Sequence, residues 1–356
     1  MEYRTRFFEV SLPASLLDFD SVPIATKLIT AAYITFTLAL YFVRRMCYSQ
    51  LLAQGETDVN YTMVTSPIVQ LIPAQIFSYP ASLVLSNLID VEWWKFIVNL
   101  VNLVIGGSFI ERNWNSSKEM FKFTIVIGSL TNLVVIAFTL LLSMVLPAIR
   151  LDLPLDGNYT VLVGFPILYK QLAPETTIFK ITNVPLLSKN FRFKLLPTFV
   201  LFSMTVIQLV WFHHFSQLLS IWITFFTCWI YLRFYQVLPP ALSGTTEMDM
   251  ADDASDTTEL DVVGDASDTF QLIYFFPGFL RPLLKPISKC CYDLVCIRLG
   301  LIKPFRMYDI DTCNVLAEQR GAKKIVDPAE ERRKQLALQV LQERMRADAT
   351  SGTPEP

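Results

Sequence analysis

The sequence has few of the residues on which metal centres and soluble catalytic sites depend. Only two histidines occur in 356 residues, and the six cysteines follow no paired metal-ligand spacing. A metal site is therefore not expected, and neither is a bound cofactor. Charged residues are scarce at 17%, and with a net charge of −2 no basic surface stands out for nucleic acid. The N-terminus also lacks the apolar core and cleavage site of a signal peptide, so the first membrane helix is expected to direct insertion.

Long apolar runs are what the sequence does contain, with 53% hydrophobic residues and a mean hydropathy of +0.42. A helix of roughly 20 apolar residues crosses a hydrocarbon core about 30 Å thick. Residues 66–89 are long enough, but Pro67, Pro73 and Pro80 each remove a backbone donor, so this segment is interpreted as a half-immersed or surface-lying loop. Six runs predict membrane spans, at 22–43, 93–110, 121–146, 159–172, 195–212 and 217–235.

Positive charge favours one orientation of these six spans. With a cytosolic N-terminus, the cytosolic loops hold eight Lys and Arg residues and the lumenal loops hold three. Both termini are therefore predicted to be cytosolic. The sequons at Asn60 and Asn158 would then face the lumen as candidate glycosylation sites, whereas the sequon at Asn115 would face the cytosol.

Composition divides the chain outside the spans. An acidic, Ser/Thr-rich stretch is typical of a disordered linker, and the apolar but proline-broken residues after it favour a segment lying on the membrane surface. Asp327, Pro328 and Glu330 are typical of a helix start. The predicted parts are a cytosolic N-terminus at 1–21, a membrane domain at 22–236, a disordered acidic linker at 237–268, an interfacial amphipathic segment at 269–304, and a cytosolic tail at 305–356 with a helix at 327–347.

Two features of the C-terminal region are candidates for modification and binding. Cys290 and Cys291 lie in the juxtamembrane segment as candidates for lipidation, with buried free thiols as the alternative. One apolar face of the helix at 327–347 is predicted to dock a cytosolic partner, and the alternative is a helix resting on the protein's own membrane domain. That face consists of Ala337, Leu338, Leu341 and Met345.

Polar and small residues share single faces of three predicted spans. Buried amides need partners, and small residues let helix backbones approach closely, so helix packing is favoured over an ion or substrate path. The face of span 217–235 is expected to pack against Gly164. The residues concerned are Asn99, Asn102 and Gly106 on span 93–110, Gly128 and Asn132 on span 121–146, Gly164 on span 159–172, and Ser220 and Thr224 on span 217–235.

The end of the second span carries a motif with two interpretations. Glu111 and Trp114 either brace the loop that follows, through a carboxylate that accepts loop amides and an indole at the interface, or form an ordinary solvated helix end. Both residues lie in Gly106–Trp114, which resembles the GG-x-x-x-E-x-x-W segment of rhomboid-like membrane proteins.

Three further segments narrow this resemblance. Cys228–Gln236, Phe275–Pro277 and Glu331–Leu338 are similar to the rhomboid-like Golgi family of transmembrane protein 115. The resemblance implies an all-α polytopic membrane protein, with a six-helix rhomboid-like bundle and a cytosolic C-terminal tail. It also implies residence in the Golgi membrane, with the ER as a further location. The implied role is in Golgi organisation and Golgi-to-ER retrograde vesicle transport, through cytosolic trafficking or tethering proteins.

Catalytic residues of a rhomboid protease are missing from their expected places. A serine nucleophile on the fourth span needs a histidine base on the sixth span within hydrogen-bond reach. The fourth span reads Val161–Leu168 without a serine, and His213 and His214 precede the sixth span. A non-catalytic scaffold is therefore favoured. The alternatives are a derlin-like factor in ER membrane-protein quality control, a transporter, and an intramembrane protease with an unrecognised nucleophile, while homo-oligomerisation stays open.

Overall fold

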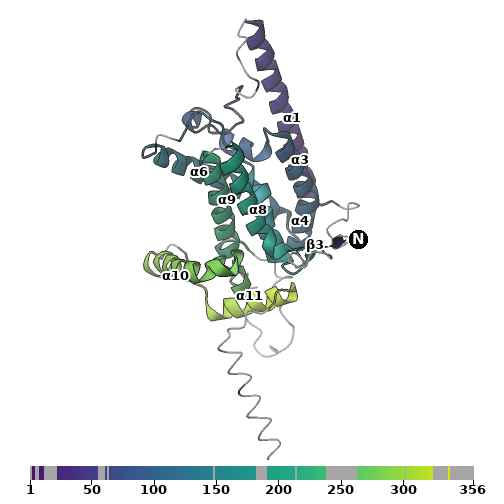
Figure 1. Cartoon of the computed structure of the whole chain (residues 1–356), viewed down its shortest axis with the longest axis vertical. Helices are drawn as coiled ribbons and strands as arrows, with labels where there is room; N and C mark the ends of the chain where they lie inside the picture. The colour runs from purple at the N-terminus through teal and green to yellow at the C-terminus, as the bar shows by residue number, and fades with distance from the viewer. Residues whose placement is uncertain are drawn as a thin grey trace, which may run out of the picture. The chain divides into compact units, whose positions relative to one another are not determined.

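Helices dominate the computed structural model. It describes residues 2–4, 8–11, 22–54, 61, 64–146, 149–181, 191–212, 215–237, 263–300, 302–323 and 336. Within these residues, five helices are long and apolar enough to cross a membrane (Figure 1). They are Ile24–Ala53, Trp93–Trp114, Ser117–Ser143, Phe193–Val210 and Phe215–Phe234. The chain is therefore a polytopic membrane protein whose membrane domain is helical.

Most spans are built from an α-helix joined to a π-helical stretch. The first span is α1, Ile24–Ala53, and the last is α9, Phe215–Phe234. The second consists of α3 (Trp93–Val101), η5 (Asn102–Gly107) and α4 (Ser108–Trp114). The third consists of α5 (Ser117–Phe121), η6 (Lys122–Ile127) and α6 (Gly128–Ser143). The fifth consists of η8 (Phe193–Leu195), α8 (Leu196–Ile207) and η9 (Gln208–Phe212).

The fourth predicted span is a short helix at the centre of the bundle. It joins η7, Thr160–Gly164, to α7, Phe165–Leu172. Thirteen residues at 1.5 Å each extend about 20 Å, less than a hydrocarbon core of about 30 Å. Every residue of this helix is buried, as expected for a helix that is apolar on all sides over most of its length. The predicted count of six spans depends on this central helix and stays a prediction.

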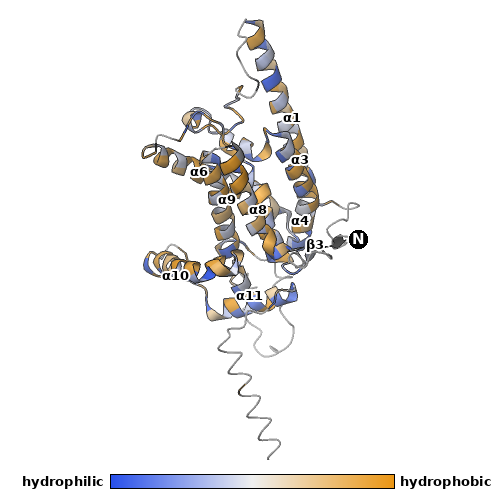
Figure 2. Cartoon of the chain, in the orientation of Figure 1, coloured by the Kyte–Doolittle hydropathy of each residue, from blue (hydrophilic) through white to orange (hydrophobic). Residues whose placement is uncertain are grey.

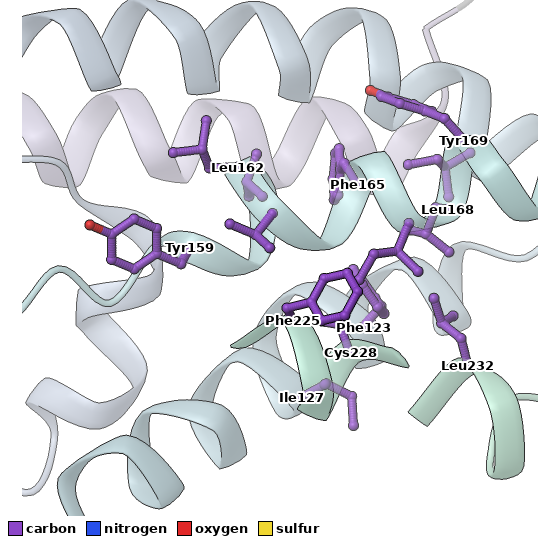
Figure 3. Close-up of a cluster of buried hydrophobic side chains, with 14 of the residues drawn as sticks. Phe123, Ile127, Tyr159, Leu162, Phe165, Leu168, Tyr169, Phe225, Cys228 and Leu232 are labelled. Atoms are coloured by element: carbon purple, nitrogen blue, oxygen red, sulfur yellow. The ribbon is translucent and has the colours of Figure 1, made fainter. Parts of the chain in front are cut away.

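The core of the bundle forms around the central helix (Figure 3). Phe123 and Ile127 reach it from the third span, and Phe225 and Cys228 reach it from α9. The outer faces of α6 and α8 stay apolar, which suits contact with lipid (Figure 2). The fully buried position of the central helix explains how it holds the other spans together.

The first helix is longer than its predicted span. The sequence predicted a span at 22–43, directly before Arg44 and Arg45, but α1 continues to Ala53. Arg44 is buried because its Nε donates to Val64 O at 2.8 Å and its Nη2 donates to Tyr61 O at 3.0 Å. A charged residue can end an apolar run without ending a helix, since helix formation depends on backbone bonding and not on hydropathy.

Residues 66–89 form a packed, irregular segment. Its regular pieces are η3 (Pro73–Gln75), α2 (Ser82–Leu85) and η4 (Ser86–Leu88). In the described stretch 64–90, no helix is longer than four residues. A half-immersed or surface-lying position for this segment stays a prediction.

A small antiparallel sheet, absent from the sequence-based prediction, joins the N-terminus to the loop after α7. Its order is β1 (Glu2–Arg4), β2 (Phe8–Ser11), β3 (Thr177–Ile181) and β4 (Phe191–Arg192). In its register, Glu9 lies opposite Lys180. The sheet places the N-terminus and this loop on the same side of the bundle. We call this side, where α1 begins and α9 ends, the amino-terminal end.

The region after α9 differs from the prediction. Residues 263–280 fold as short turns, and they are followed by α10 (Arg281–Tyr292), η14 (Asp293–Arg298) and α11 (Met307–Gln319). The predicted disordered linker at 237–268 is therefore wrong for 263–268, and α11 was not predicted. Residues 1–322 form one compact unit and 323–356 another. The docking residues Ala337, Leu338, Leu341 and Met345 lie outside the described residues, as does the predicted helix at 327–347 apart from Leu336.

Candidate functional site

Residues 263–280, here called the clasp, bind the amino-terminal end of the bundle through buried polar groups. Arg233 at the end of α9 donates from Nη1 to Asp265 O and to Ser267 O, at 2.6 Å each. Gln171 at the end of α7 donates to the Asp265 carboxylate at 3.2 Å. Gly264 N donates to Gln236 O at 2.7 Å. A buried guanidinium needs acceptors, and the clasp carbonyls supply them.

Aromatic side chains of the clasp enter the bundle core. Phe270, Phe275 and Phe276 are buried, and the rings of Phe275 and Phe276 meet Phe225 edge-on. Lys170 is buried against the clasp, with its ammonium 2.9 Å from Tyr274 O. The part of the predicted interfacial segment at 269–304 that holds these three phenylalanines therefore belongs to the core, since burying three phenylalanines stabilises the fold more than leaving them at a membrane surface.

Helix α11 covers the other side of the clasp. Asn314 exchanges two hydrogen bonds with Asp268, at 2.8 Å to its amide nitrogen and 3.0 Å to its carboxylate. Cys313 packs onto Gly264 O, and burial raises the pKa of this thiol to about 12. The clasp thus lies between α9 and α11, and it links the chain that follows to the membrane domain.

The opposite end of the bundle holds a buried polar cluster around Asp90. The Tyr33 hydroxyl donates to the Asp90 carboxylate. Asn99 and Asn158 donate to the same oxygen at 2.8 and 3.3 Å. Since α1, α3 and the loop before η7 each contribute one donor, Asp90 ties three segments together.

Lys95 extends this cluster with a buried ion pair. Its side chain is 3% exposed and contacts the Asp156 carboxylate, with Glu92 at 3.3 Å. The ammonium also lies 5.7 Å from the centre of the Tyr159 ring, and the Tyr159 hydroxyl donates to Gln217 at 3.0 Å. Sequence reasoning missed this pair. The available signal was that Lys95 shares one helical face with Asn99, Asn102 and Gly106, at spacings of four, three and four.

The predicted packing residues of the second span contact the central helix. Asn102 donates to Val161 O at 2.7 Å and accepts from the Tyr169 hydroxyl. A Cβ at Gly106 would clash with that same hydroxyl. The missing side chain of Gly106 therefore leaves room for the bond between Tyr169 and Asn102.

The predicted packing residues of the third span contact residues 82–89. Asn132 donates to Leu83 O and to Ser86 Oγ, each at 3.0 Å. A Cβ at Gly128 would meet the Asn87 side chain. The Asn132 amide therefore satisfies one backbone carbonyl and one hydroxyl of this irregular segment and ties it to the third span.

Gly164 and α9 meet closely at the centre of the bundle. A Cβ at Gly164 would lie 3.0 Å from Cys228 Sγ and 3.1 Å from Phe123 Cζ. Ser220 and Thr224 donate within α9, to Ser216 O at 3.3 Å and to Ser220 O at 2.7 Å. Because both hydroxyls bond within α9, these residues contribute to helix packing through their small size.

Glu111 caps the first helix. Its carboxylate accepts from Ala25 N at 3.1 Å, from Thr26 N and Thr26 Oγ1 at 2.7 Å each, and from Ser117 Oγ at 2.6 Å. A carboxylate at a helix N-terminus satisfies orphan amides and complements the helix dipole. Glu111 therefore stabilises the start of α1 through Ala25 and Thr26, in addition to the loop that it was predicted to stabilise, which it contacts through Ser117. Trp114 is 1% exposed and packs edge-on to Phe123, so its predicted place at the interface is wrong.

The predictions on glycosylation, lipidation and metal binding have different outcomes. Asn158 is 2% exposed with its amide on Asp90, so its predicted glycosylation does not fit the folded chain. Asn60 lies outside the described residues, and so do His213 and His214. Cys290 and Cys291 are exposed, so the alternative of buried thiols is wrong. Among the residues that the structure describes, no group of three His, Cys, Asp or Glu side chains could hold a metal ion.

The Asp90 carboxyl should make stability depend on pH. Burial raises its pKa to about 7, although hydrogen bonds from Tyr33 and Asn99 oppose the shift. Lys95 also lowers this pKa, whereas Asp156 raises it. Between about pH 4 and about pH 7, the folded protein holds a proton that the unfolded chain has lost. The free energy of unfolding therefore falls as pH rises, by at most about 1.4 kcal/mol per pH unit.

Thermal unfolding in lipid nanodiscs at about pH 5 and about pH 7 measures this effect. The wild-type protein is expected to lose stability at the higher pH, and the Asp90→Asn variant is expected to lose less. An identical pH dependence in the two proteins would contradict the assignment to Asp90.

Comparisons with known proteins agree with this architecture. The profile of a family described as eukaryotic integral membrane protein (DUF1751) matches residues 27–347. The transmembrane protein 115 homolog of Saccharomyces cerevisiae is 55% identical over 353 residues, which are 97% of this chain and 99% of that protein. Rhomboid-like protein 19 of Arabidopsis thaliana is 27% identical, over 69% of this chain and 72% of that protein.

A more distant relative is transmembrane protein 115 of Homo sapiens, which is 22% identical over 73% of this chain and 66% of that protein. No solved structure matches the chain. The span pattern, the long match to the profile and the high identity to one curated relative all agree, and the chain therefore belongs to the DUF1751 family of eukaryotic integral membrane proteins that includes transmembrane protein 115.

Proposed function

We propose that this protein is a non-catalytic, rhomboid-like membrane scaffold that acts in Golgi organisation and Golgi-to-ER retrograde transport. Membership of the transmembrane protein 115 family and the likeness to a protein named rhomboid-like support the proposal. The observation that carries it is the clasp, because it fastens the chain that leads to the C-terminal tail onto the membrane domain.

The interior of the bundle supports a scaffold over an enzyme. Bulky apolar side chains fill the central helix and its surroundings, including Leu162, Phe165 and Leu168 (Figure 3). Cys228 is the group of α9 nearest to Gly164, and no base stands beside it in the described core. A hydroxyl or thiol nucleophile needs such a base and access for water. The close apolar packing of this region suits a structural role rather than a catalytic one.

The tail is the proposed working surface. Because α11 is bound to the clasp, the chain is fastened to the membrane domain up to the point where the tail begins. A partner held by the tail would therefore be kept at high local concentration near the membrane. We place the termini in the cytosol on the strength of the charge count, with trafficking or tethering proteins as partners and the Golgi membrane, and also the ER, as the location. A derlin-like role in the ER is the alternative, and it differs in location and partners.

Aspartates at Leu338 and Leu341 should abolish recruitment of the cytosolic partner. Each change places a carboxylate on the docking face, and burying it there without a partner costs several kcal/mol. In cells that lack the protein, the double variant is expected to reach the Golgi at normal abundance and to leave retrograde transport unrestored. The assays are proximity labelling from the tail and the rate of Golgi-to-ER return of a reporter.

Leu336→Asp is the matched control. Leu336 is helical and exposed, and helical spacing puts it away from the docking face. This control is expected to restore transport. Full restoration by the Leu338 and Leu341 double variant would move attention to the segment Glu111–Trp114, whereas a protein confined to the ER would favour the derlin-like alternative.

A further inference from the structure

Helix α10 has two faces of opposite character. Leu283, Ile287, Cys290 and Leu294 repeat at spacings of four, three and four, so they line one face of α10 and its continuation η14. Leu283 is 66% exposed and Ile287 is 52% exposed. A second face carries three cations at spacings of four, namely Arg281, Lys285 and Lys289. An exposed apolar face opposite a basic one is typical of a helix that lies in the plane of a membrane.

The start of α10 is fixed where two membrane spans end. Thr198, in the first turn of α8, donates to Phe275 O. Trp229, near the end of α9, donates to Phe270 O at 3.1 Å. Leu280 and Leu284 then pack against the bundle core, so one side of α10 is held by protein. Figure 1 shows α10 turning away from the direction of α9 at this point.

The surface beside α10 favours lipid as the occupant of its free face. Leu195 and Phe199, in the first turns of the fifth span, are exposed apolar residues, as expected where a span faces lipid. The clasp that leads into α10 is bonded to that same turn of α8. The apolar face of α10 therefore lies at the depth where the spans leave the hydrocarbon. Its cations suit the anionic headgroups at that depth.

We propose that α10 is an in-plane membrane helix and that Cys290 and Cys291 on it are S-acylated. The exposed apolar positions and the two adjacent free thiols, both exposed, carry this inference. An amphipathic helix or one acyl chain alone binds a membrane reversibly, whereas two signals together anchor it stably. The proposal does not depend on the trafficking role.

S-acylation of these cysteines transfers an acyl group from one thiol to another by thioester exchange. The Sγ of each cysteine attacks the carbonyl carbon of a long-chain acyl-coenzyme A, and a new C–S bond forms. The C–S bond to coenzyme A breaks, and the coenzyme leaves as a thiol with the proton that the cysteine has lost. No group is oxidised or reduced. The other cysteines give internal controls, since Cys228, Cys296 and Cys313 are buried and Cys47 is exposed on α1.

A thiol-exchange assay on the full-length protein from expressing cells tests the modification. Free thiols are blocked, thioesters are cleaved with neutral hydroxylamine, and the released thiols receive a maleimide mass tag. The wild-type protein is expected to gain two hydroxylamine-dependent tags, Cys290→Ser and Cys291→Ser one each, and the double variant none. Cys47→Ser is expected to keep both tags. A wild-type protein without hydroxylamine-dependent tags, or a double variant that keeps them, would overturn the acylation.

The position of the helix is tested separately in the Cys47→Ser, Cys290→Ser, Cys291→Ser background. Ile287→Cys and Lys285→Cys are each labelled with a fluorophore, in nanodiscs of phosphatidylcholine and phosphatidylserine. Quenchers on the lipid chains should quench the label at position 287 more strongly, and an aqueous quencher should do so at position 285. Equal aqueous quenching at both positions would show that α10 does not lie in the membrane, whatever the state of the cysteines.

Discussion

Replacing Lys95 by methionine should lower the free energy of unfolding by about 3–5 kcal/mol, the range for breaking a buried ion pair on one side. The side chain is 3% exposed and contacts Asp156, with Glu92 nearby. Removal of the ammonium leaves a carboxylate in a site with little access to water, and that uncompensated charge is the main cost. Thermal or denaturant unfolding of the protein in nanodiscs measures the loss.

Two further variants separate the effect of the lost charge on stability from the effect of changed packing. Lys118→Met removes an exposed ammonium at the other end of the bundle and is expected to change stability little. Combining Lys95→Met with Asp156→Asn removes both charges, so it should recover much of the lost stability. A single variant as stable as the wild-type protein, or a double variant no better than the single one, would show that the pair does not stabilise this end of the bundle.

Replacing Gly264 by alanine should release the clasp from the bundle. Gly264 has φ of +82°, and a Cβ there would lie 3.0 Å from the carbonyl carbon of Arg233 and would clash with its oxygen. The left-handed conformation alone costs about 1–2 kcal/mol for a residue with a side chain. The backbone contact adds to this cost, because the end of α9 cannot move without losing the bonds from Arg233 to the clasp.

Gly300→Ala is the matched control for the clasp. Gly300 also has a positive φ, of +60°, but a Cβ there would meet nothing within 4 Å. It should therefore show only the conformational cost. Hydrogen exchange of residues 263–280 is expected to rise strongly in Gly264→Ala and to stay near wild type in Gly300→Ala. Similar exchange in both variants would mean that close packing at Gly264 does not hold the clasp.

A loosened clasp should also change the behaviour of the tail. The clasp contacts α11 through Asn314 and Asp268, so Gly264→Ala weakens the link between the bundle and everything that follows. If the tail recruits partners, as proposed, Gly264→Ala should reduce recruitment while the tail sequence is intact. Gly264→Ala thus tests whether the partner needs the tail alone or the tail held at the membrane.

The sequence by itself determined where the five long apolar helices lie. The predicted spans at 93–110 and 217–235 correspond to Trp93–Trp114 and Phe215–Phe234 in the structure. This agreement has a physical reason, since a segment in lipid must satisfy its backbone internally and an apolar run of sufficient length becomes a helix. The family was also identifiable from short ordered motifs such as Gly106–Trp114, which lies within the residues that the family profile matches.

Only the tertiary structure decided which polar residues act together. Glu111 and Thr26 are 85 positions apart in the chain, and Arg233 and Ser267 are 34 apart, yet each pair is bonded. Residues 263–268 of the clasp have the composition of a linker, yet their polar atoms bond to partners in α7 and α9 rather than to water. Lys95 and Asp156 are charged residues of the kind usually found in exposed loops and helix ends. Their burial depends on how α3 packs against the central helix. Hydropathy measures the preference of one segment for lipid or water, so it cannot report bonds that form only after distant segments have packed.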